Sequence, residues 1–277
     1  MKKEFVKNLI NYRKRIYSQT IEDGIIEGIF ENIGTSNKYF VEFGAWDGVA
    51  FSNTANLRIN EGWNGLLLEG NKDKADKLNY IKHAFLTAEN INEHFEKNNV
   101  PKVFDLLSID LDGNDYWIWN AIDENRFRAR VVVVEFNCNI PNQNDSIAIK
   151  YTPELDSTVP SINYYGASLS AFKKLGEEKG YSLIYRVNNH NLFFVDKTLL
   201  HDNDIDIPIE KFLNKNGLSE LDTQATTKPN QNVYNYDDKL LLDVFYGKNM
   251  VPHWNEYADT SINIWWPQRF DKEWVKV

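Results

Sequence analysis

Cysteine and an excess of positive charge are what this sequence most clearly lacks. Its 277 residues include one cysteine, Cys138, and its 31 lysines and arginines stand against 40 acids, a formal net charge of −9. A single thiol forms neither an intramolecular disulfide nor a site built from several thiolates, so we expect a reducing, cytoplasmic environment. The acidic balance disfavours a protein whose main partner is the phosphate backbone of a nucleic acid.

Long hydrophobic runs are also missing. Charged residues or amides interrupt every apolar stretch before it reaches the roughly 18 residues of a membrane span, so we predict no such span. The basic residues 1–17 spread their apolar side chains among lysines and arginines, which is typical of a helix with one apolar face and not of a signal peptide. Such a helix docks on its own protein or on an anionic membrane surface, and we expect the former.

The remaining composition, 42% hydrophobic and 14% aromatic, predicts a packed globular fold. Seven short hydrophobic runs predict strands at residues 39–43, 65–69, 84–88, 104–109, 130–136, 181–186 and 191–195. Apolar spacing typical of helices occurs at residues 21–33, 72–81, 91–97, 115–122 and 164–179. Strands that are joined by helical crossovers form a parallel sheet covered on both faces, and the last two runs predict a hairpin that closes it.

This pattern predicts an α/β chain of three parts. We expect N-terminal helices in residues 1–37, a core in residues 38–197 and an aromatic-rich appendage in residues 198–277 that forms a lid or a homodimer contact. The appendage contains Trp254, Trp265, Trp266 and Trp274. Within the core, the polar residues 137–163 are too many for a plain connection, and we expect them to form a substrate loop.

The first predicted strand leads into a glycine-containing loop with an acid at each end, Glu42 and Asp47. Because they lack a Cβ, Gly44 and Gly48 let the backbone turn sharply and approach a bound molecule closely, although a tight turn without a ligand is the plain alternative. A dinucleotide-binding loop would carry G-x-G-x-x-G, which this sequence lacks. The two acids would repel a diphosphate but suit a ligand with an amino group and a sulfonium charge.

A further acid, Glu69, ends the second predicted strand, where its carboxylate can accept hydrogen bonds from both hydroxyls of a ribose. The chain thus carries E-F-G-A-x-D-G, then S-N-T, then this acid, and the pattern resembles the first two motifs of class I S-adenosylmethionine-dependent methyltransferases. The similarity is greatest to the FkbM-like group of bacterial O-methyltransferases and covers roughly residues 38–195. It implies a Rossmann-like, doubly wound, mostly parallel sheet of seven strands.

The resemblance also implies that S-adenosyl-L-methionine is the cofactor. The loop from Glu42 to Gly48, with Gly44, Ala45 and Asp47, would hold the methionine portion, Glu69 would hold the ribose, and Glu89 and Asn90 would flank the adenine. Further candidate cofactor-binding residues are Ser52, Asn53 and Gly70.

Asp110 and Asp112 follow the fourth predicted strand and are the first catalytic candidates. If the strand continued, both carboxylates would point the same way, and one could act as general base with its pKa raised by the other. Alternatively the pair binds Mg²⁺ with Glu135 or Asn137. Metal-dependent O-methyltransferases place acids at comparable strand ends, but this sequence lacks their usual paired aspartates after the fifth strand. A turn that caps the helix at Asp115 is compatible with both chemistries.

His190 lies in the predicted hairpin near the same sheet edge and is the third catalytic candidate, because an imidazole suits proton transfer near neutral pH. A lone loop histidine is more often a surface residue. Candidate substrate-binding residues are Asn137, after the fifth strand, and Tyr164, Tyr165 and Ser168, at the start of the helix that follows the polar loop. Helix capping and packing are the alternative roles for the last three.

The polar loop and the many aromatic residues favour a carbohydrate acceptor, since sugar rings stack on aromatic faces while amides and acids bind sugar hydroxyls. FkbM-like relatives act on sugars, polyketides and similar metabolites. We therefore expect methylation of a sugar hydroxyl, on a nucleotide-linked sugar for a bacterial capsular or surface polysaccharide. Two other classes stay open: an NAD(P)-dependent oxidoreductase on the same type of sheet, which the missing glycine fingerprint disfavours, and a non-catalytic interaction module that keeps the fold.

Overall fold

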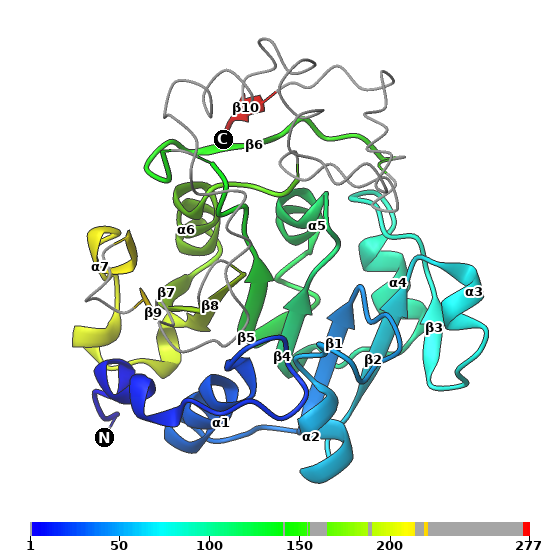
Figure 1. Cartoon of the computed structure of the whole chain (residues 1–277), viewed down its shortest axis with the longest axis horizontal. Coiled ribbons are helices and arrows are strands. Elements are labelled where there is room, and N and C mark those ends of the chain that lie inside the picture. The colour runs from blue at the N-terminus through cyan, green and yellow to red at the C-terminus, as the bar shows by residue number, and fades with distance from the viewer. Residues whose placement is uncertain are drawn as a thin grey trace, which may run out of the picture.

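A single mixed sheet forms the centre of the protein in a computed structural model that describes residues 2–140, 142–153, 155, 165–187, 190–213, 219–220 and 274–277 (Figure 1). Its strand order is β3-β2-β1-β4-β5-β8-β7-β9. The strands are β1 (Tyr39–Phe43), β2 (Asn64–Glu69), β3 (Ile81–His83), β4 (Val103–Ile109), β5 (Arg128–Glu135), β7 (Tyr181–Val187), β8 (Asn191–Asp196) and β9 (Ser219–Glu220).

The pairing confirms the predicted Rossmann-like sheet of seven mostly parallel strands. All neighbours from β3 to β5 pair in parallel, whereas β8 pairs antiparallel with both β5 and β7. The two-residue β9 adds an eighth strand at the edge, parallel to β7. The four consecutive valines of β5, Val131 to Val134, are all fully buried, as expected for a central strand that helices cover on both faces.

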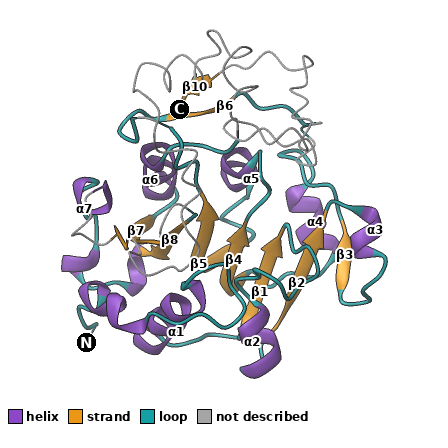
Figure 2. Cartoon of the chain, viewed as in Figure 1, coloured by secondary structure: helices purple, strands orange, loops and turns teal. Residues whose placement is uncertain are grey.

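Helices cover both faces of the sheet. They are η1 (Val6–Tyr12), α1 (Glu22–Ile33), α2 (Ala55–Asn60), α3 (Lys72–Ala75), α4 (Ile91–Lys97), α5 (Asp115–Ala121), α6 (Leu169–Glu178), η2 (Lys197–Leu199), η3 (Asp202–Asp204) and α7 (Glu210–Leu213). In Figure 2, α1 and α2 lie on the opposite side of the sheet from α5 and α6. The N-terminal helix is a 3₁₀ helix, and the burial of Phe5, Val6 and Leu9 shows that it docks on the protein's own body.

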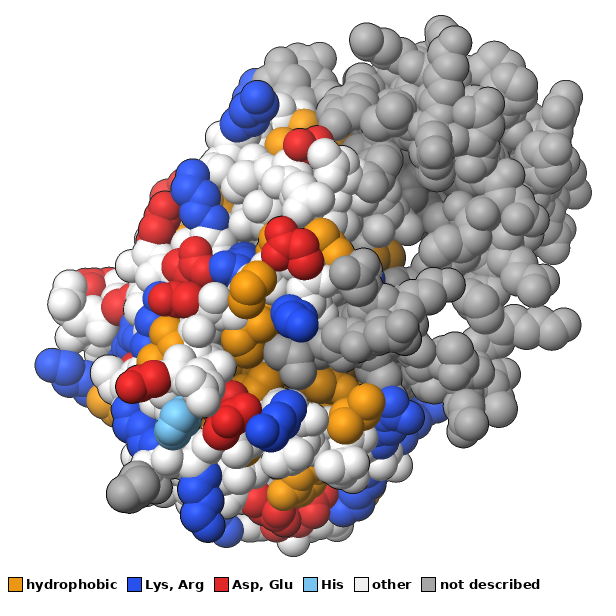
Figure 3. All heavy atoms as spheres, turned by 90° about the vertical axis from the view of Figure 1, so that its left-hand side faces the viewer, with side chains coloured by type: hydrophobic (Ala, Val, Ile, Leu, Met, Phe, Trp, Pro, Cys, Tyr) orange, Lys and Arg blue, Asp and Glu red, His pale blue; other side chains and the backbone are white. Residues whose placement is uncertain are grey.

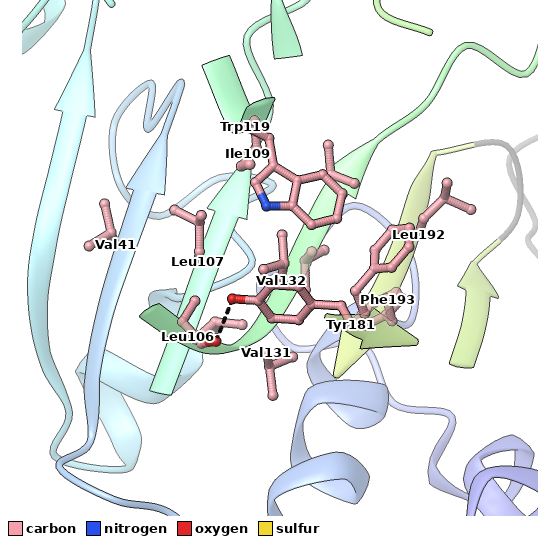
Figure 4. Close-up of a cluster of buried hydrophobic side chains, with 14 of the residues drawn as sticks. Val41, Leu106, Leu107, Ile109, Trp119, Val131, Val132, Tyr181, Leu192 and Phe193 are labelled. Atoms are coloured by element: carbon pink, nitrogen blue, oxygen red, sulfur yellow. Dashed lines mark hydrogen bonds between the residues drawn. The ribbon is translucent and has the colours of Figure 1, made fainter. Parts of the chain in front are cut away.

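The core beneath α5 and α6 is rich in aromatic side chains. Figure 4 shows Trp119 above Tyr181, with both rings packed among the aliphatic side chains of β4 and β5. The Tyr181 hydroxyl donates to the carbonyl of Ala129 at 2.8 Å, so the buried phenol keeps a partner for its polar end.

The region around β3 differs from the prediction. The expected helix at residues 72–81 ends at Ala75, and the expected strand at residues 84–88 lies three residues earlier, at Ile81–His83. Ile81 pairs with Leu67 of β2, so an apolar residue that continues the helical spacing belongs to the sheet instead. Residues 84–88 form a loop, because the amide side chain of Asn90 binds backbone groups within it.

The expected substrate loop, residues 137–163, contains a strand that the sequence did not predict. This strand, β6 (Ile147–Ile149), pairs antiparallel with β10 (Trp274–Lys276) near the C-terminus. Ala148 also bridges to Ala167, just before α6. Most of the predicted appendage lies outside the described residues, as do Trp254, Trp265 and Trp266.

No helix within the described ranges combines the length and the apolar character that a membrane crossing requires. On the face drawn in Figure 3, acidic and basic side chains are interspersed with one another. The acidic side chains therefore do not form one separate patch on this face.

A buried carboxylate, Asp105 in β4, ties the loop between α1 and β1 to the sheet. Its side chain is fully buried and accepts hydrogen bonds from the backbone N–H groups of Ser36, Asn37 and Lys38, at 2.7 to 2.9 Å. Arg130 of the neighbouring strand β5 forms an ion pair with it at 2.6 Å. Since the charge is fully paired and hydrogen-bonded, it can remain in the interior.

We predict that Asp105→Asn lowers the free energy of unfolding by about 2 to 4 kcal/mol, because an amide offers one acceptor oxygen to these donors and leaves Arg130 unpaired. Asp73→Asn, at an exposed position in α3, should change it by less than about 0.5 kcal/mol. Urea unfolding of both variants measures the difference, and equal losses would contradict the assigned role.

Candidate functional site

The order of the strands reverses at β1, which lies between β2 and β4. In open α/β sheets, ligands bind beyond the carboxyl ends of the strands at such a point. Here the loops after β1 and β4 touch: Gly44 has a φ of +68°, and a Cβ on it would overlap the carbonyl oxygen of Asp110. Glycine is therefore required at this position both for its backbone conformation and for the close approach of the two loops.

Glu42 is a buried anchor beneath this loop. One carboxylate oxygen accepts from the hydroxyls of Ser52 at 2.8 Å and Thr54 at 2.6 Å, and the other accepts from the backbone N–H of Asn53 at 3.0 Å. Burial raises the pKa of Glu42, and these hydrogen bonds oppose the shift. The Asn53 side chain in turn donates to Ser108 of β4 at 3.1 Å. Three predicted cofactor-binding residues thus also build the floor of the loop.

Asp47 and Gly48 shape the outer half of the same loop. The Asp47 carboxylate accepts from the backbone N–H groups of Val49 and Ala50, at 2.8 and 2.7 Å. Gly48 has a φ of +68° and is packed against Tyr80, whose hydroxyl donates to the Asp47 carbonyl at 2.8 Å. The loop is therefore preformed by its own side chains.

Glu69, at the end of β2, joins the loops after β1 and β2. Its two carboxylate oxygens accept from the backbone N–H groups of Trp46 at 2.8 Å and Asn71 at 2.7 Å. Each oxygen keeps a second lone pair for a ligand. Trp46 is 58% exposed with a φ of +47°, and the ammonium group of Lys74 lies 3.1 Å from the centroid of its ring.

The loop after β3 contributes an exposed aromatic ring that sequence reasoning missed. Phe85 is 43% exposed, and a Cβ at Gly70 would lie 3.6 Å from its ring. Glu89 accepts from the hydroxyl of Tyr151 at 2.6 Å, which links this loop to the segment after β6. The Asn90 amide is engaged within the loop, since it accepts from the Thr87 N–H and donates to the Phe85 carbonyl.

Three acids meet at the ends of β4 and β5. Asp110, Asp112 and Glu135 each offer an oxygen within 4.8 Å of the others. The two aspartates were predicted to point the same way if the strand continued through them. It does not, because β4 ends at Ile109 and Asp112 has a φ of +53°. Removal from solvent and mutual repulsion raise the pKa values of Asp110 and Glu135 well above their usual range.

Asp115 holds the turn that brings these acids together. The side chain at this first position of α5 is buried and accepts from the N–H groups of Leu111 at 2.7 Å and Gly113 at 3.0 Å. Burial raises the pKa of Asp115 to about 6. A turn thus precedes this helix together with the acidic cluster, but the predicted side-chain cap is absent, since the N-cap residue Asn114 makes no capping hydrogen bond.

The predicted substrate-binding residues fall into different settings. Ser168 is fully buried, caps α6 by accepting from the N–H of Ala171 at 3.1 Å and donates to the carbonyl of Asp145, so helix capping is its observed role. The Asn137 amide donates to the carbonyl of Tyr165 at 2.9 Å. Burial raises the pKa of the Tyr165 hydroxyl, and so does the negative charge of Glu135. Tyr164 lies outside the described residues.

His190 lies in the turn between β7 and β8, at the edge where β5 ends, and its carbonyl accepts from the N–H of Phe136 at 3.0 Å. Burial lowers the pKa of the imidazole, and the nearby charge of Glu22 opposes this shift. Glu22 is a residue that the sequence did not single out. It is fully buried in the first turn of α1 and also acts electrostatically on Asp110.

Comparison with known proteins finds likeness in fold only. The chain matches no known family model, and no curated protein matches it. Similar solved structures include an O-methyltransferase from Bacillus cereus in complex with SAH, at 15% identity and a TM-score of 0.38, with 68% of this chain and 88% of that chain covered. The CcbJ methyltransferase from Streptomyces caelestis has 9% identity and a TM-score of 0.39, with 70% and 97% covered.

The CurJ carbon methyltransferase has 9% identity and a TM-score of 0.39, with 65% of this chain covered. The chain spans little more than half of that protein, 56%, and a similar part, 54%, of the pyocyanin biosynthetic protein PhzM.

Gly44→Ala tests the contact between the loops after β1 and β4. Gly34 has the same φ of +68°, but a Cβ added to it would meet no atom within 4 Å, so Gly34→Ala isolates the cost of the backbone conformation. We predict a loss of about 1 kcal/mol in unfolding free energy for Gly34→Ala and at least about 2 kcal/mol more for Gly44→Ala, measured by urea unfolding. Similar losses would show that the two loops do not need this approach.

Proposed function

We propose that this chain is an S-adenosylmethionine-dependent O-methyltransferase. The observation that carries the proposal is the Glu69 carboxylate, which links the loops after β1 and β2 beside the point where strand order reverses. It keeps lone pairs for the two hydroxyls of a ribose. The acids around this point suit a ligand that carries an ammonium and a sulfonium charge.

Each loop has a role in this proposal. The methionine portion of the cofactor would lie along Gly44, Ala45 and Asp47, above the floor that Glu42, Ser52 and Asn53 build. Glu69 and Gly70 would hold the ribose, and the exposed ring of Phe85 would lie at the adenine with Glu89 and Asn90 behind it. When bound, S-adenosylmethionine supplies an electrophilic methyl group.

Asp110 and Asp112 would serve the acceptor. Because its pKa is raised, Asp110 is suited to take the proton of an acceptor hydroxyl, with Asp112 beside it. The methyl group would pass to that oxygen as its bond to sulfur breaks, and S-adenosylhomocysteine would leave. His190 is a second candidate base at the same sheet edge. Alignment of the acceptor oxygen with the methyl carbon would supply much of the rate enhancement, with Tyr165 as a donor to the substrate.

The acceptor that we propose is a sugar hydroxyl, on a nucleotide-linked sugar for a bacterial surface polysaccharide, methylated in the cytoplasm. The exposed Trp46 ring beside the site offers a face on which a sugar can stack. Contact between two copies through the C-terminal region is part of the same proposal.

An oxidoreductase is the weaker alternative. In the dinucleotide-binding order 3-2-1-4-5-6, the sheet continues past its fifth strand with a parallel sixth. Here β5 is followed in the sheet by β8, which is antiparallel to it. A non-catalytic module would have no need for three acids that repel one another at one edge of the sheet, and such an arrangement favours catalysis.

Glu69→Gln tests the cofactor site. We predict that it lowers the affinity for S-adenosylhomocysteine (SAH) at least about tenfold in calorimetry, because an amide loses one acceptor and a charge. Glu61→Gln, exposed after α2, is the control and should bind like the wild type. Mass spectrometry after incubation with S-adenosylmethionine and a panel of nucleotide sugars should show the gain of one methyl group. Equal SAH binding by both variants would reject the cofactor assignment.

A specific observation also favours a divalent cation at the acidic cluster. Carboxylate oxygens are the ligands that Mg²⁺ prefers, and Asp110, Asp112 and Glu135 each offer one oxygen within 4.8 Å of the other two. A cation held there would offset the repulsion among the three acids and could orient the acceptor hydroxyl.

If the cation takes part, EDTA should abolish methyl transfer and Mg²⁺ should restore it, while SAH affinity stays within about twofold because Glu69, the proposed ribose ligand, is not a member of the cluster. If methyl transfer continues at an unchanged rate in EDTA, the cation is not required, and the acids keep only the general-base role.

A further inference from the structure

At the meeting point of β5 and β8, two buried oxygens receive no hydrogen bond from the described residues, although buried polar atoms normally make such bonds. They are Oδ1 of Asn191, the first residue of β8, and Oε2 of Glu135, the last residue of β5. Asn191 is only 4% exposed. Both oxygens are therefore open to a donor or to a cation.

The pairing of the strands places these two side chains together. Glu135 and Asn191 are directly opposite each other in the antiparallel pair of β5 and β8. Residues opposite each other in such a pair project to the same face of the sheet, with Cβ atoms about 4.5 to 5.5 Å apart. The Asn191 side chain therefore neighbours the acidic cluster, of which Glu135 is a member.

Glu22 determines which end of the Asn191 amide is left without a partner. The Glu22 carboxylate accepts a hydrogen bond from the Asn191 amide nitrogen at 3.2 Å. If the amide were turned around, its oxygen would face the Glu22 carboxylate and be repelled. Glu22 is itself held by the N–H and hydroxyl of Thr20, at 2.7 and 2.9 Å. The amide is thus fixed with its nitrogen toward Glu22 and its oxygen away from it.

We propose that Asn191 is a fourth oxygen ligand of a divalent cation that Asp110, Asp112 and Glu135 hold. This inference rests on the cation candidate of the proposed function and extends it to β8, outside the loops after β4 and β5. A neutral carbonyl oxygen adds a hard ligand without adding a fourth negative charge beside Glu22. Glu22 acts as a positioning residue, since it orients the amide without being a ligand.

The test uses Mn²⁺ alone as the probe, followed by electron paramagnetic resonance and calorimetry on the full chain. The wild type should bind one Mn²⁺, and Asn191→Leu should lower the affinity at least about tenfold because the oxygen is lost. Asn191→Asp should bind Mn²⁺ more tightly than Asn191→Leu, since a carboxylate keeps an oxygen at the ligand position. Asn125→Ala, at an exposed position, is the matched control and should bind like the wild type.

Several outcomes overturn the inference: no Mn²⁺ binding by the wild type, binding by Asn191→Leu equal to the wild type, or binding by Asn191→Asp no tighter than by Asn191→Leu. Asn191→Ala, which also lacks the oxygen, replaces Asn191→Leu in these comparisons if that variant does not fold. SAH calorimetry on the same samples separates this inference from the proposed function. SAH binding without an effect of Asn191 on Mn²⁺ rejects the fourth ligand alone, whereas Mn²⁺ binding that depends on Asn191 without SAH binding rejects the cofactor assignment alone.

Discussion

Hydrogen bonds from backbone N–H groups to buried carboxylates hold the loops of this protein in place. Asp105 ties the loop before β1 to β4, and Glu42 ties the start of α2 to β1. Glu69 links the loops after β1 and β2, and Asp115 closes the turn after β4. A buried carboxylate is stable only when such donors compensate its lost hydration. Some of the acidic residues that give the chain its negative net charge therefore have a structural role.

This constraint separates structural acids from those available for chemistry. The carboxylates of Asp105 and Asp115 have backbone donors on both of their oxygens. Where β5 ends and β8 begins, by contrast, Glu135 and Asn191 keep acceptor oxygens that receive no hydrogen bond from the described residues. Unsatisfied buried acceptors are costly. These two open acceptors at one edge of the sheet support the proposed cation site.

Local sequence pattern was sufficient for elements whose apolar residues have the spacing of one buried strand or one helical face. The strand at Tyr39–Phe43 and the helix at Ile91–Lys97 were predicted with the observed bounds. The error around β3 arose because Ile81 continues a helical spacing while it pairs in the sheet. β6 could not be predicted, since its partner β10 lies more than a hundred residues further along the chain and neither strand has a distinctive pattern of its own.

Part of the candidate site was predicted, because the topology of the sheet brings the ends of neighbouring strands together. The carboxyl ends of parallel strands share one edge, so Asp110, Asp112 and Glu135 could be grouped before their geometry was known. Glu22 and Asn191 escaped notice, because a glutamate in the first turn of a helix is usually a surface residue favoured by the helix dipole. The antiparallel pairing of β8 with β5 places Asn191 opposite Glu135, and Glu22 of α1 accepts a hydrogen bond from the Asn191 amide.

A crystal structure of the chain grown with SAH is the most direct measurement of the central claim. The nucleoside should lie between the loops after β1 and β2, with its ribose hydroxyls on Glu69 and its sulfur facing Asp110. A nucleoside bound elsewhere, or side chains filling that space, would contradict it.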